Sequence, residues 1–338
     1  MGSLFLKGLY DPIGEDRDVA NECFVCGITL DSTNRTKEHI YPQWLIARAG
    51  LTGETIRSPF LNKKTPYASF TIPACRKCNT GQLQLLEKKV QKAFTKVDFD
   101  KSDLTQEEIA IWTSKLLYGT ILYDYIHASG DTRLHLQEIL SWDDYQFMHA
   151  AIQSLLGKIQ IGVFGEFPIS IRIFKVKIPE HPRERFGLTT NPQSGAMVLR
   201  TDHLGLFVSF DAGYISRFGG RFFDSYAGRK LHPAQFDELA AHWLYMSSLQ
   251  NCSIPFGRRT DEDGKIHIIY IYDSIDLIMR DMGTLGAFDE QVTSDFRQHL
   301  SLTTNISIEK LGEGESVPSW LYDSSGAFYE MDIEGPRR

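Results

Sequence analysis

The stretch TKEHIYPQWL, Thr36 to Leu45, places an acid directly before a histidine and follows the pair with Ile-Tyr-Pro. Two cysteine pairs bracket this stretch: Cys23 and Cys26 in ECFVCG, and Cys75 and Cys78 in PACRKCN. Two C-x-x-C pairs can supply four thiolates to one tetrahedral Zn²⁺, and a site with four sulfurs has no open position for a substrate. We therefore expect one structural zinc ion that staples together the two ends of the segment carrying the Glu-His pair.

Length and composition are those of a globular intracellular protein. The chain has 338 residues, of which 42% are hydrophobic and 23% charged, and this length allows two or three domains. No apolar run approaches the roughly 20 residues that cross a bilayer, and the N-terminus lacks the pattern of a signal peptide. We therefore expect a cytoplasmic location and no contact with membranes. In a reducing compartment paired cysteines favour metal over disulfides, and the fifth cysteine, Cys252, is expected to be buried and inert.

Charge is unevenly distributed along the chain. Between Thr33 and Val97 twelve Lys or Arg residues and three acids give a net charge of +9, and the whole chain carries −7, which leaves −16 for the rest. A basic patch inside the cysteine-bearing segment is the electrostatic footprint of a phosphate-binding face. A solvated, lysine-rich surface is the alternative, above all for the lysines of the expected helix. The residues expected to contact nucleic acid are Lys63, Lys64, Arg76, Lys77, Lys88, Lys89 and Lys92.

Helices are expected directly after the second cysteine pair. The first begins with Asn79 or Thr80 as its cap, so that it starts where the cysteine pair ends. A longer apolar helix follows, with Ser102 or Thr105 as its cap, and a third is expected over 134–156. The apolar residues that give the first helix its period are Leu83, Leu86, Val90, Phe94 and Val97.

From about residue 159 the hydrophobic pattern changes to the two-residue period of β-strands. A helix with Pro233 in its first turn is expected over 231–250. The glycine-rich segment 213–223 is expected to be a connection, with a hairpin or a bulge at 216–223. The last residues, 319–338, are expected to be a terminal strand or a docked tail. These patterns predict an α+β fold with a mostly antiparallel sheet and helices in the C-terminal part. The expected strands are 159–164, 169–178, 196–200, 204–210 and 265–273.

Three short motifs together resemble the HNH endonucleases, also called ββα-metal nucleases, and among them the zinc-stapled kind. That kind has C-x-x-C, then an acid followed by His-Ile-x-Pro, then C-x-x-C followed by His or Asn. The corresponding pieces here are CFVC, EHIYP and CRKCN, and the resemblance covers about residues 20–97, under a third of the chain. We therefore expect a zinc-stapled nuclease domain at 1–100, a helical connector at 101–157, and an α+β domain of regulatory, sensing or oligomerising role at 158–338.

The resemblance implies roles for three residues. The general base of the family falls on His39, and the ligands of a catalytic metal fall on Glu38 and Asn79. A neutral imidazole accepts a proton from water near pH 7, and a hard divalent ion held by oxygen ligands stabilises the leaving oxygen. Because neighbouring side chains of a strand point to opposite sides, a local turn is expected to let Glu38 reach the metal. Asn79 stands where His is common, and a neutral oxygen ligand favours Mg²⁺ or Mn²⁺ over softer ions.

The segment also departs from the family pattern. The central Asn that orients the histidine has no clear counterpart, and Asn62 is the nearest candidate. Gln82, one turn beyond Asn79, could also reach the site, whereas Glu87 is expected to pair with lysines at the surface. Without the family roles, EHIYPQWL would be only a strand end followed by a helix.

The function expected from these observations is that of a metal-dependent HNH endonuclease. It would hydrolyse phosphodiester bonds, with DNA as the expected substrate, and leave 5′-phosphate and 3′-hydroxyl ends. The acidic C-terminal part is expected to restrain the nuclease, to receive a small-molecule or protein regulator, or to mediate homo-oligomerisation. By analogy, bacterial anti-phage defence effectors are often built in this way. The alternative is a zinc-stapled module that binds nucleic acid or a partner and has lost cleavage.

Overall fold

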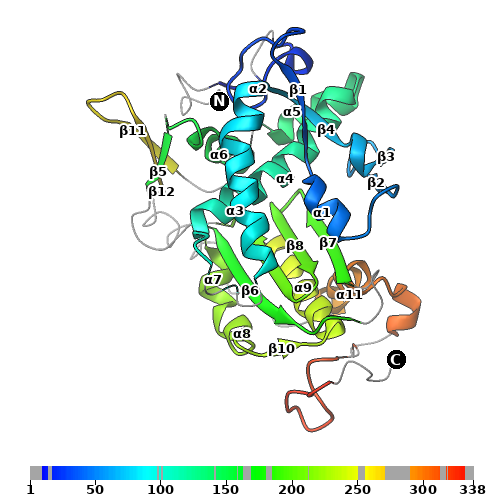
Figure 1. The fold of residues 1–338 in the computed structure, drawn as a ribbon. Helices are drawn as coiled ribbons and strands as arrows, with labels where there is room; N and C mark the ends of the chain where they lie inside the picture. The colour runs from blue at the N-terminus through cyan, green and yellow to red at the C-terminus, as the bar shows by residue number, and fades with distance from the viewer. Residues whose placement is uncertain are drawn as a thin grey trace. The chain divides into compact units, whose positions relative to one another are not determined.

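The computed structural model describes most of the chain (Figure 1). Cys252 and Val97 lie outside the described residues, and so do the ends of the expected strands 159–164 and 265–273. Within the described part of the chain, no helix combines the length and the apolar character that crossing a membrane requires. The described residues are 10–13, 17–96, 99, 102–140, 142–157, 159–162, 169–179, 185–211, 213–249, 256–270, 290–312, 317 and 319–331.

The chain divides into two compact units. Unit 1 comprises Met1–Glu166 with Ser253–Ser274, and unit 2 comprises Phe167–Cys252 with Ile275–Arg338. The helices expected as a connector at 101–157 belong to unit 1, together with the cysteine-bearing segment. Helices and strands occur in both units and most strand pairs are antiparallel, so the expected α+β class is confirmed.

Unit 1 begins with short strands and continues with helices. Its described strands are β1 (Arg35–His39), β2 (Thr55–Arg57), β3 (Lys64–Pro66), β4 (Thr71–Cys75), β5 (Ile159–Gly162), β11 (Phe256–Thr260) and β12 (Ile266–Tyr270). Its described α-helices are α1 (Gln43–Arg48), α2 (Arg76–Cys78), α3 (Gln84–Thr95), α4 (Gln106–His127), α5 (Gly130–Leu140) and α6 (Asp143–Ser154). The shorter turns are the 3₁₀ turns η2 (Val19–Asn21) and η3 (Tyr67–Ser69), and the π-helical turn η4 (Asn79–Leu83).

Strands β1 and β4 form an antiparallel pair that carries the Glu-His motif. The pairing continues to the end of β1, where Glu38 lies opposite Ile72 and His39 opposite Thr71. The other strand pairs of unit 1 are β2 with β3, β11 with β12, and the parallel pair β12 with β5. Strands β5 and β12 confirm the expectations for the described parts of 159–164 and 265–273.

The helix expected after the second cysteine pair is present as α2, η4 and α3 in succession. The expected cap at Asn79 or Thr80 is wrong, because the helical segment begins earlier. Cys75 occupies the N-cap position of α2, and its sulfur accepts a hydrogen bond from the backbone N–H of Cys78 at 3.4 Å. A cysteine sulfur therefore takes the place of the usual oxygen acceptor at a helix start.

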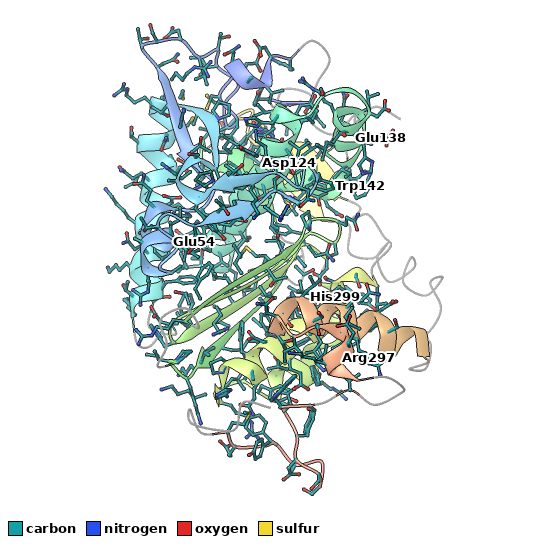
Figure 2. The ribbon with its side chains drawn as sticks, turned by 90° about the vertical axis from the view of Figure 1, so that its right-hand side faces the viewer. Glu54, Asp124, Glu138, Trp142, Arg297 and His299 are labelled. Carbon is teal, nitrogen blue, oxygen red and sulfur yellow. The ribbon has the colours of Figure 1, made fainter. Side chains whose placement is uncertain are left out.

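Helix α4 is buried along most of its length. Thr105 caps it as expected: its hydroxyl accepts from the N–H of Glu108, and the Glu108 carboxylate accepts from the Thr105 N–H in return. Every residue from Ile109 to Tyr125 is buried, and a helix that is buried on all sides belongs to a core. Asp124 (Figure 2) accepts hydrogen bonds from the backbone N–H groups of Phe60 and Leu61, and so ties α4 to the β2–β3 loop.

The single helix expected over 134–156 is wrong. The segment forms α5 and α6, with Trp142 between them in an extended conformation at the N-cap position of α6. The apolar period continues across this break, so the hydrophobic pattern by itself does not reveal it.

Unit 2 is a five-stranded sheet with helices. The strand order is β10-β6-β9-β8-β7, and only β10 with β6 is a parallel pair. The strands are β6 (Ser170–Val176), β7 (Phe186–Asn191), β8 (Ala196–Thr201), β9 (Leu204–Ser209) and β10 (Lys230–Leu231). The described helices are α7 (Tyr214–Phe218), α8 (Gly220–Asp224), α9 (Pro233–Ser248), α11 (Glu290–Thr304) and the 3₁₀ turn η7 (Ile308–Leu311).

Helix α9 packs closely on the sheet of unit 2. A Cβ atom at Gly205 would lie 1.9 Å from the Phe236 ring, so a glycine is required where this ring meets β9. Phe207 and Trp243 extend the same aromatic contact, with ring centroids 5.4 Å apart. The predicted strands and the helix with Pro233 in its first turn are therefore confirmed in unit 2.

Two expectations for unit 2 need correction or completion. The segment 216–223 is not a hairpin or a bulge but lies in the helices α7 and α8, and the buried Asp211 carboxylate accepts the N–H groups of Gly213 and Ile215 at the start of α7. Strand β7 was not expected, since FGLTTN lacks the alternation of a half-buried strand and forms only by pairing with β8.

The described part of the C-terminal segment is a docked tail, as one of the two expectations had it. Trp320, Leu321 and Met331 are buried in the core of unit 2. The Glu238 carboxylate of α9 accepts the N–H groups of Trp320 and Leu321, and the Gln235 amide donates to the Trp320 carbonyl.

Candidate metal centre and the Glu-His strand

The four paired cysteines converge on one point in unit 1. One sulfur from each residue lies within 4.8 Å of all the others, and the sulfurs of Cys26 and Cys75 are 3.8 Å apart. Four thiolates at about 2.3 Å from a tetrahedral Zn²⁺ are about 3.8 Å from one another. Cys23, Cys75 and Cys78 are buried, and Cys26 is half-buried. The arrangement can therefore hold a metal ion such as zinc.

Local backbone geometry presents these sulfurs. The Gly27 N–H donates to the Cys23 carbonyl at 2.8 Å, and Gly27 has a φ of +73°, which closes the first knuckle in the left-handed region that favours glycine. The N–H of Phe24 donates to the Pro73 carbonyl at 3.1 Å, so the first knuckle is attached to β4. The second pair lies at the junction of β4 and α2, with Cys75 ending the strand and Cys78 ending the short helix.

Crowding of the sulfurs favours a bound cation. A hydrogen bond to the Cys23 sulfur, together with burial, raises the pKa of the Cys78 thiol, and burial raises the pKa of Cys26 to about 11. Four thiolates this close repel one another, and a divalent cation at their centre relieves that repulsion. The donor set therefore fits a structural zinc ion.

His149 on α6 contacts the backbone of the first knuckle, the loop that carries Cys23 and Cys26. Its Nε2 atom lies 2.6 Å from the Phe24 carbonyl oxygen, and its Nδ1 atom lies 2.9 Å from the Gln153 amide nitrogen. The imidazole stacks on Tyr118 of α4, with ring centroids 4.9 Å apart, and burial lowers its pKa to about 4. A neutral imidazole that donates from Nε2 to Phe24 and accepts at Nδ1 satisfies both contacts.

Glu38 and His39 lie on opposite faces of β1. The regular pairing with β4 leaves no local turn at Glu38, so the expectation of such a turn is wrong. Glu38 is buried, whereas His39 is half-buried and shares its face of the strand with the exposed side chains of Arg35 and Lys37.

The Glu38 carboxylate has a cationic partner from the buried helix. The Lys115 ammonium forms ion pairs with one oxygen of Glu38 and with one oxygen of Glu87 on α3. The side chains of Lys115, Glu38 and Glu87 are 1%, 6% and 21% exposed. The expectation that Glu87 pairs with surface lysines is therefore wrong, and Lys115 is a residue that the sequence analysis missed.

Burial and charge act in opposite directions in this cluster. Burial raises the pKa of Glu38 despite the attraction of Lys115, and it would lower the pKa of Lys115 if the two carboxylates did not outweigh it and raise that pKa instead. Lys115 therefore stays charged, because the carboxylates compensate its loss of solvation.

His39 is held in place by neighbours on two sides. Its Nε2 atom lies 3.3 Å from the amide nitrogen of Gln43 on α1, and the ring hydrogen-bonds to the backbone of Ala68. Burial lowers the pKa of His39 below its ordinary value, although the bond to Ala68 opposes this. A half-buried histidine that is neutral at pH 7 can accept a proton.

Asn79 lies against β1, while Asn62 is separately engaged. The Asn79 amide nitrogen donates to the Thr36 hydroxyl at 3.0 Å and to the Lys37 carbonyl at 3.1 Å. Asn62 lies in the β2–β3 turn with a φ of +52°, and its side-chain oxygen accepts from Arg57 at 3.0 Å. The left-handed backbone of this turn explains why Asn stands at position 62, since Asn tolerates the left-handed region. Gln82 is exposed within η4.

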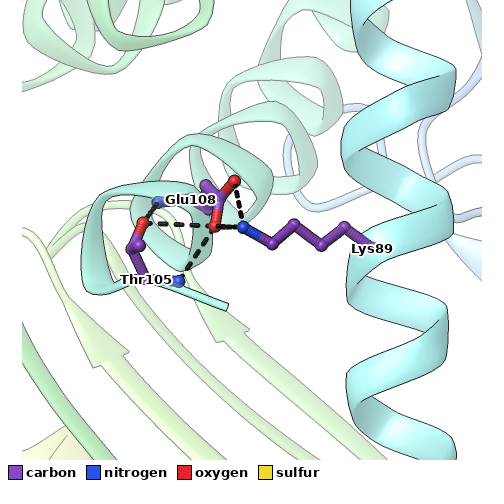
Figure 3. A network of polar contacts seen from close by, with 3 residues as sticks. All are labelled: Lys89, Thr105 and Glu108. Atoms are coloured by element: carbon purple, nitrogen blue, oxygen red, sulfur yellow. Dashed lines mark hydrogen bonds and ion pairs between the residues drawn. The ribbon is translucent and has the colours of Figure 1, made fainter. Parts of the chain in front are cut away.

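Six of the seven basic residues expected at nucleic acid are exposed. Lys89 is half-buried, and its ammonium lies 2.8 and 2.7 Å from the two oxygens of Glu108, the residue of the α4 capping box (Figure 3). The charge of Lys89 is therefore largely engaged within unit 1. The exposed residues are Lys63, Lys64, Arg76, Lys77, Lys88 and Lys92.

The residues that the resemblance assigns to Mg²⁺ or Mn²⁺ do not fit such an ion in their present arrangement. Mg²⁺ requires octahedral oxygen coordination and binds proteins through carboxylates. The Glu38 carboxylate is paired with the Lys115 ammonium, and Asn79 adds only a neutral amide whose nitrogen is bound to β1. Comparisons of the chain with protein-family models, with curated proteins and with solved structures found no match.

Proposed function

We propose that unit 1 is an HNH-like nuclease module that hydrolyses phosphodiester bonds of nucleic acid, with DNA as the expected substrate. The single observation that carries the proposal is the position of His39. It stands half-buried at the end of β1, the strand that pairs with the cysteine-bearing β4, on the face that also bears exposed Arg35 and Lys37.

The chemistry assigned to these residues is base catalysis beside a cationic surface. The neutral imidazole of His39 takes a proton from water as the water oxygen forms a bond to phosphorus. The bond from phosphorus to the 3′ oxygen breaks, and this oxygen takes a proton from solvent, so that 5′-phosphate and 3′-hydroxyl ends result. Arg35 and Lys37 attract the phosphate backbone. The Mg²⁺ or Mn²⁺ that the resemblance implies has no role in this scheme, because Glu38 already has Lys115 as its counter-ion.

The proposal is tested by incubating zinc-loaded protein with supercoiled plasmid, with Mg²⁺, with Mn²⁺ and without added metal. We expect nicked or linear product from wild type and a loss of about 10²–10⁴-fold in rate for His39→Ala. The matched control is His135→Ala, which removes an exposed histidine of α5. Equal cleavage by wild type and His39→Ala would rule out the assignment of the base.

A second candidate function is favoured by the Lys115–Glu38 ion pair. A buried ammonium on the carboxylate that the family uses for its metal is the arrangement expected of a module that binds nucleic acid without cutting it. Binding of labelled DNA or RNA without cleavage in any metal would support this candidate. Cleavage that depends on His39 would exclude it.

Unit 2 is proposed to regulate unit 1. We assign it a restraining or sensing role for a small-molecule or protein regulator, or a role in homo-oligomerisation, by analogy with bacterial anti-phage defence effectors. Light scattering of the purified chain tests the oligomer. Comparing cleavage by the full chain in the presence and absence of lysate small molecules tests the regulator.

A further inference from the structure

We propose that the Lys115 ammonium is the resident cation between Glu38 and Glu87, so that this carboxylate pair takes no Mg²⁺ or Mn²⁺ while Lys115 is in place. The inference deepens the proposed function, because it concerns the metal requirement of the same strand. It is carried by an ion pair that joins β1, α3 and α4.

The cluster is built from the interior of unit 1. Lys115 lies on α4 with a side chain that is 1% exposed, and one oxygen from each glutamate contacts its nitrogen. A buried ammonium persists only where carboxylates compensate its lost solvation, and here two of them do. The ammonium therefore occupies the position at which a divalent ion would bridge the same two oxygens.

Helix α4 is held where Lys115 must face β1. Gly119 lies one turn after Lys115 on the same face, and a Cβ atom there would come within 3.3 Å of Ile40 and Ile72. Ile72 is the residue of β4 directly opposite Glu38. The close approach of α4 to this ribbon thus brings the Lys115 side chain to Glu38 as a consequence of packing.

An ammonium and a divalent ion exclude each other at this position. Two cations a few ångströms apart inside a protein repel strongly. To admit a divalent ion, the Lys115 side chain would have to move away from both carboxylates, although α4 is buried on all sides. Glu38 therefore holds α4 against β1 and does not hold a metal ion. Hydrolysis at His39 is accordingly expected to proceed without added Mg²⁺ or Mn²⁺.

The experiment is a titration of zinc-loaded protein with Mn²⁺, followed by electron paramagnetic resonance of the free ion. We expect wild type and Glu38→Gln to bind Mn²⁺ equally weakly. Lys115→Met leaves two carboxylates without a counter-ion, and we expect its Mn²⁺ affinity to rise by at least about tenfold. The matched control is Lys89→Met, which removes another paired lysine of unit 1 and is expected to leave Mn²⁺ affinity unchanged.

The outcomes separate clearly. Mn²⁺ binding by wild type that Glu38→Gln abolishes would overturn the inference, and so would a folded Lys115→Met variant without increased affinity. If Lys115→Met fails to fold by circular dichroism, the comparison of wild type with Glu38→Gln decides alone. Absence of cleavage would contradict the nuclease proposal and leave this one standing, because its readout is metal binding.

Discussion

His39 and Glu38 are neighbours in the chain but lie in different environments. Side chains alternate along β1, so Glu38 enters the interior beside Lys115 while His39 remains on the side of Arg35 and Lys37. Under the proposed function, proton transfer falls to His39, while Glu38 forms an internal ion pair. Substitutions at the two positions should therefore fail in different ways.

At His39, substitution should affect turnover and leave stability nearly unchanged. His39→Ala removes the proton acceptor from a half-buried position, so we expect cleavage to fall about 10²–10⁴-fold with little change in the unfolding midpoint. Glu38→Ala should instead destabilise the fold, because it leaves Lys115 buried with one carboxylate fewer. Urea unfolding measures the stability of the two variants, and plasmid cleavage measures their turnover. A His39→Ala variant as unstable as Glu38→Ala would contradict the assignment of different roles to the two residues.

His149 makes the stability of unit 1 depend on pH. Burial lowers its pKa to about 4, whereas an unfolded histidine titrates near 6.5, so the unfolded state binds more protons between these values. Stability is therefore lost as the pH falls through this window, by about 2 kcal/mol between pH 7 and pH 5. His149→Gln cannot titrate and should show a flatter profile in urea unfolding. Profiles of equal slope for the two proteins would refute this assignment.

At the scale of the element, the start of α4 combines two functions. The capping box of Thr105 and Glu108 satisfies N–H groups at the helix start, and the same Glu108 carboxylate holds the Lys89 ammonium of α3 (Figure 3). Loss of the cap therefore loosens both the helix start and a link between two helices.

Replacement of Thr105 tests this helix start. Thr105→Ala removes the acceptor for the Glu108 N–H, and we expect a loss of about 1 kcal/mol in the free energy of unfolding. The control is Ser102→Ala, which changes a residue outside the helix and should cost less. Chemical denaturation followed by circular dichroism provides the measurement, and equal losses would argue against the cap.

The lysines of α3 should differ in their effect on nucleic-acid binding. Lys88 and Lys92 are exposed, whereas Lys89 is engaged by Glu108. We expect Lys88→Ala and Lys92→Ala to weaken binding and to lower the slope of log K against log salt by about 1 each, and Lys89→Ala to change it less. Fluorescence anisotropy at several salt concentrations measures this slope. A salt-independent affinity would make the whole patch a solvated surface.

At the scale of the whole molecule, the cysteine cluster holds together segments of unit 1 that are distant in the sequence. Without a metal, four crowded sulfurs lose their common partner, and the energy of binding a structural zinc ion contributes directly to folding. Unit 2 has its own buried core around α9 and does not contain this cluster.

Removal of zinc should therefore act unequally on the two units. We expect one zinc ion per chain by elemental analysis, and its loss in Cys75→Ser with unfolding around β1, β4 and α2. Hydrogen exchange should show lost protection there and retained protection in α9 of unit 2. Metal-replete protein without bound zinc, or unchanged protection in Cys75→Ser, would contradict the structural role.

Sequence by itself determined the features that depend on neighbours in the chain. The spacing of the cysteine pairs predicted a common cluster, and the two cap candidates Ser102 and Thr105 included the residue that starts α4. Alternating residues predicted the strands β6, β8 and β9 of unit 2. Hydrophobic period, capping and turn chemistry act over a few residues, so they can be recognised without knowing what packs against them.

Tertiary structure alone decided which distant residues meet. Lys115 reaches Glu38 only because α4 packs on the β1–β4 pair at Gly119, and His149 reaches the first knuckle from α6. Such contacts depend on which faces of separate elements are buried together, and no local period carries that information.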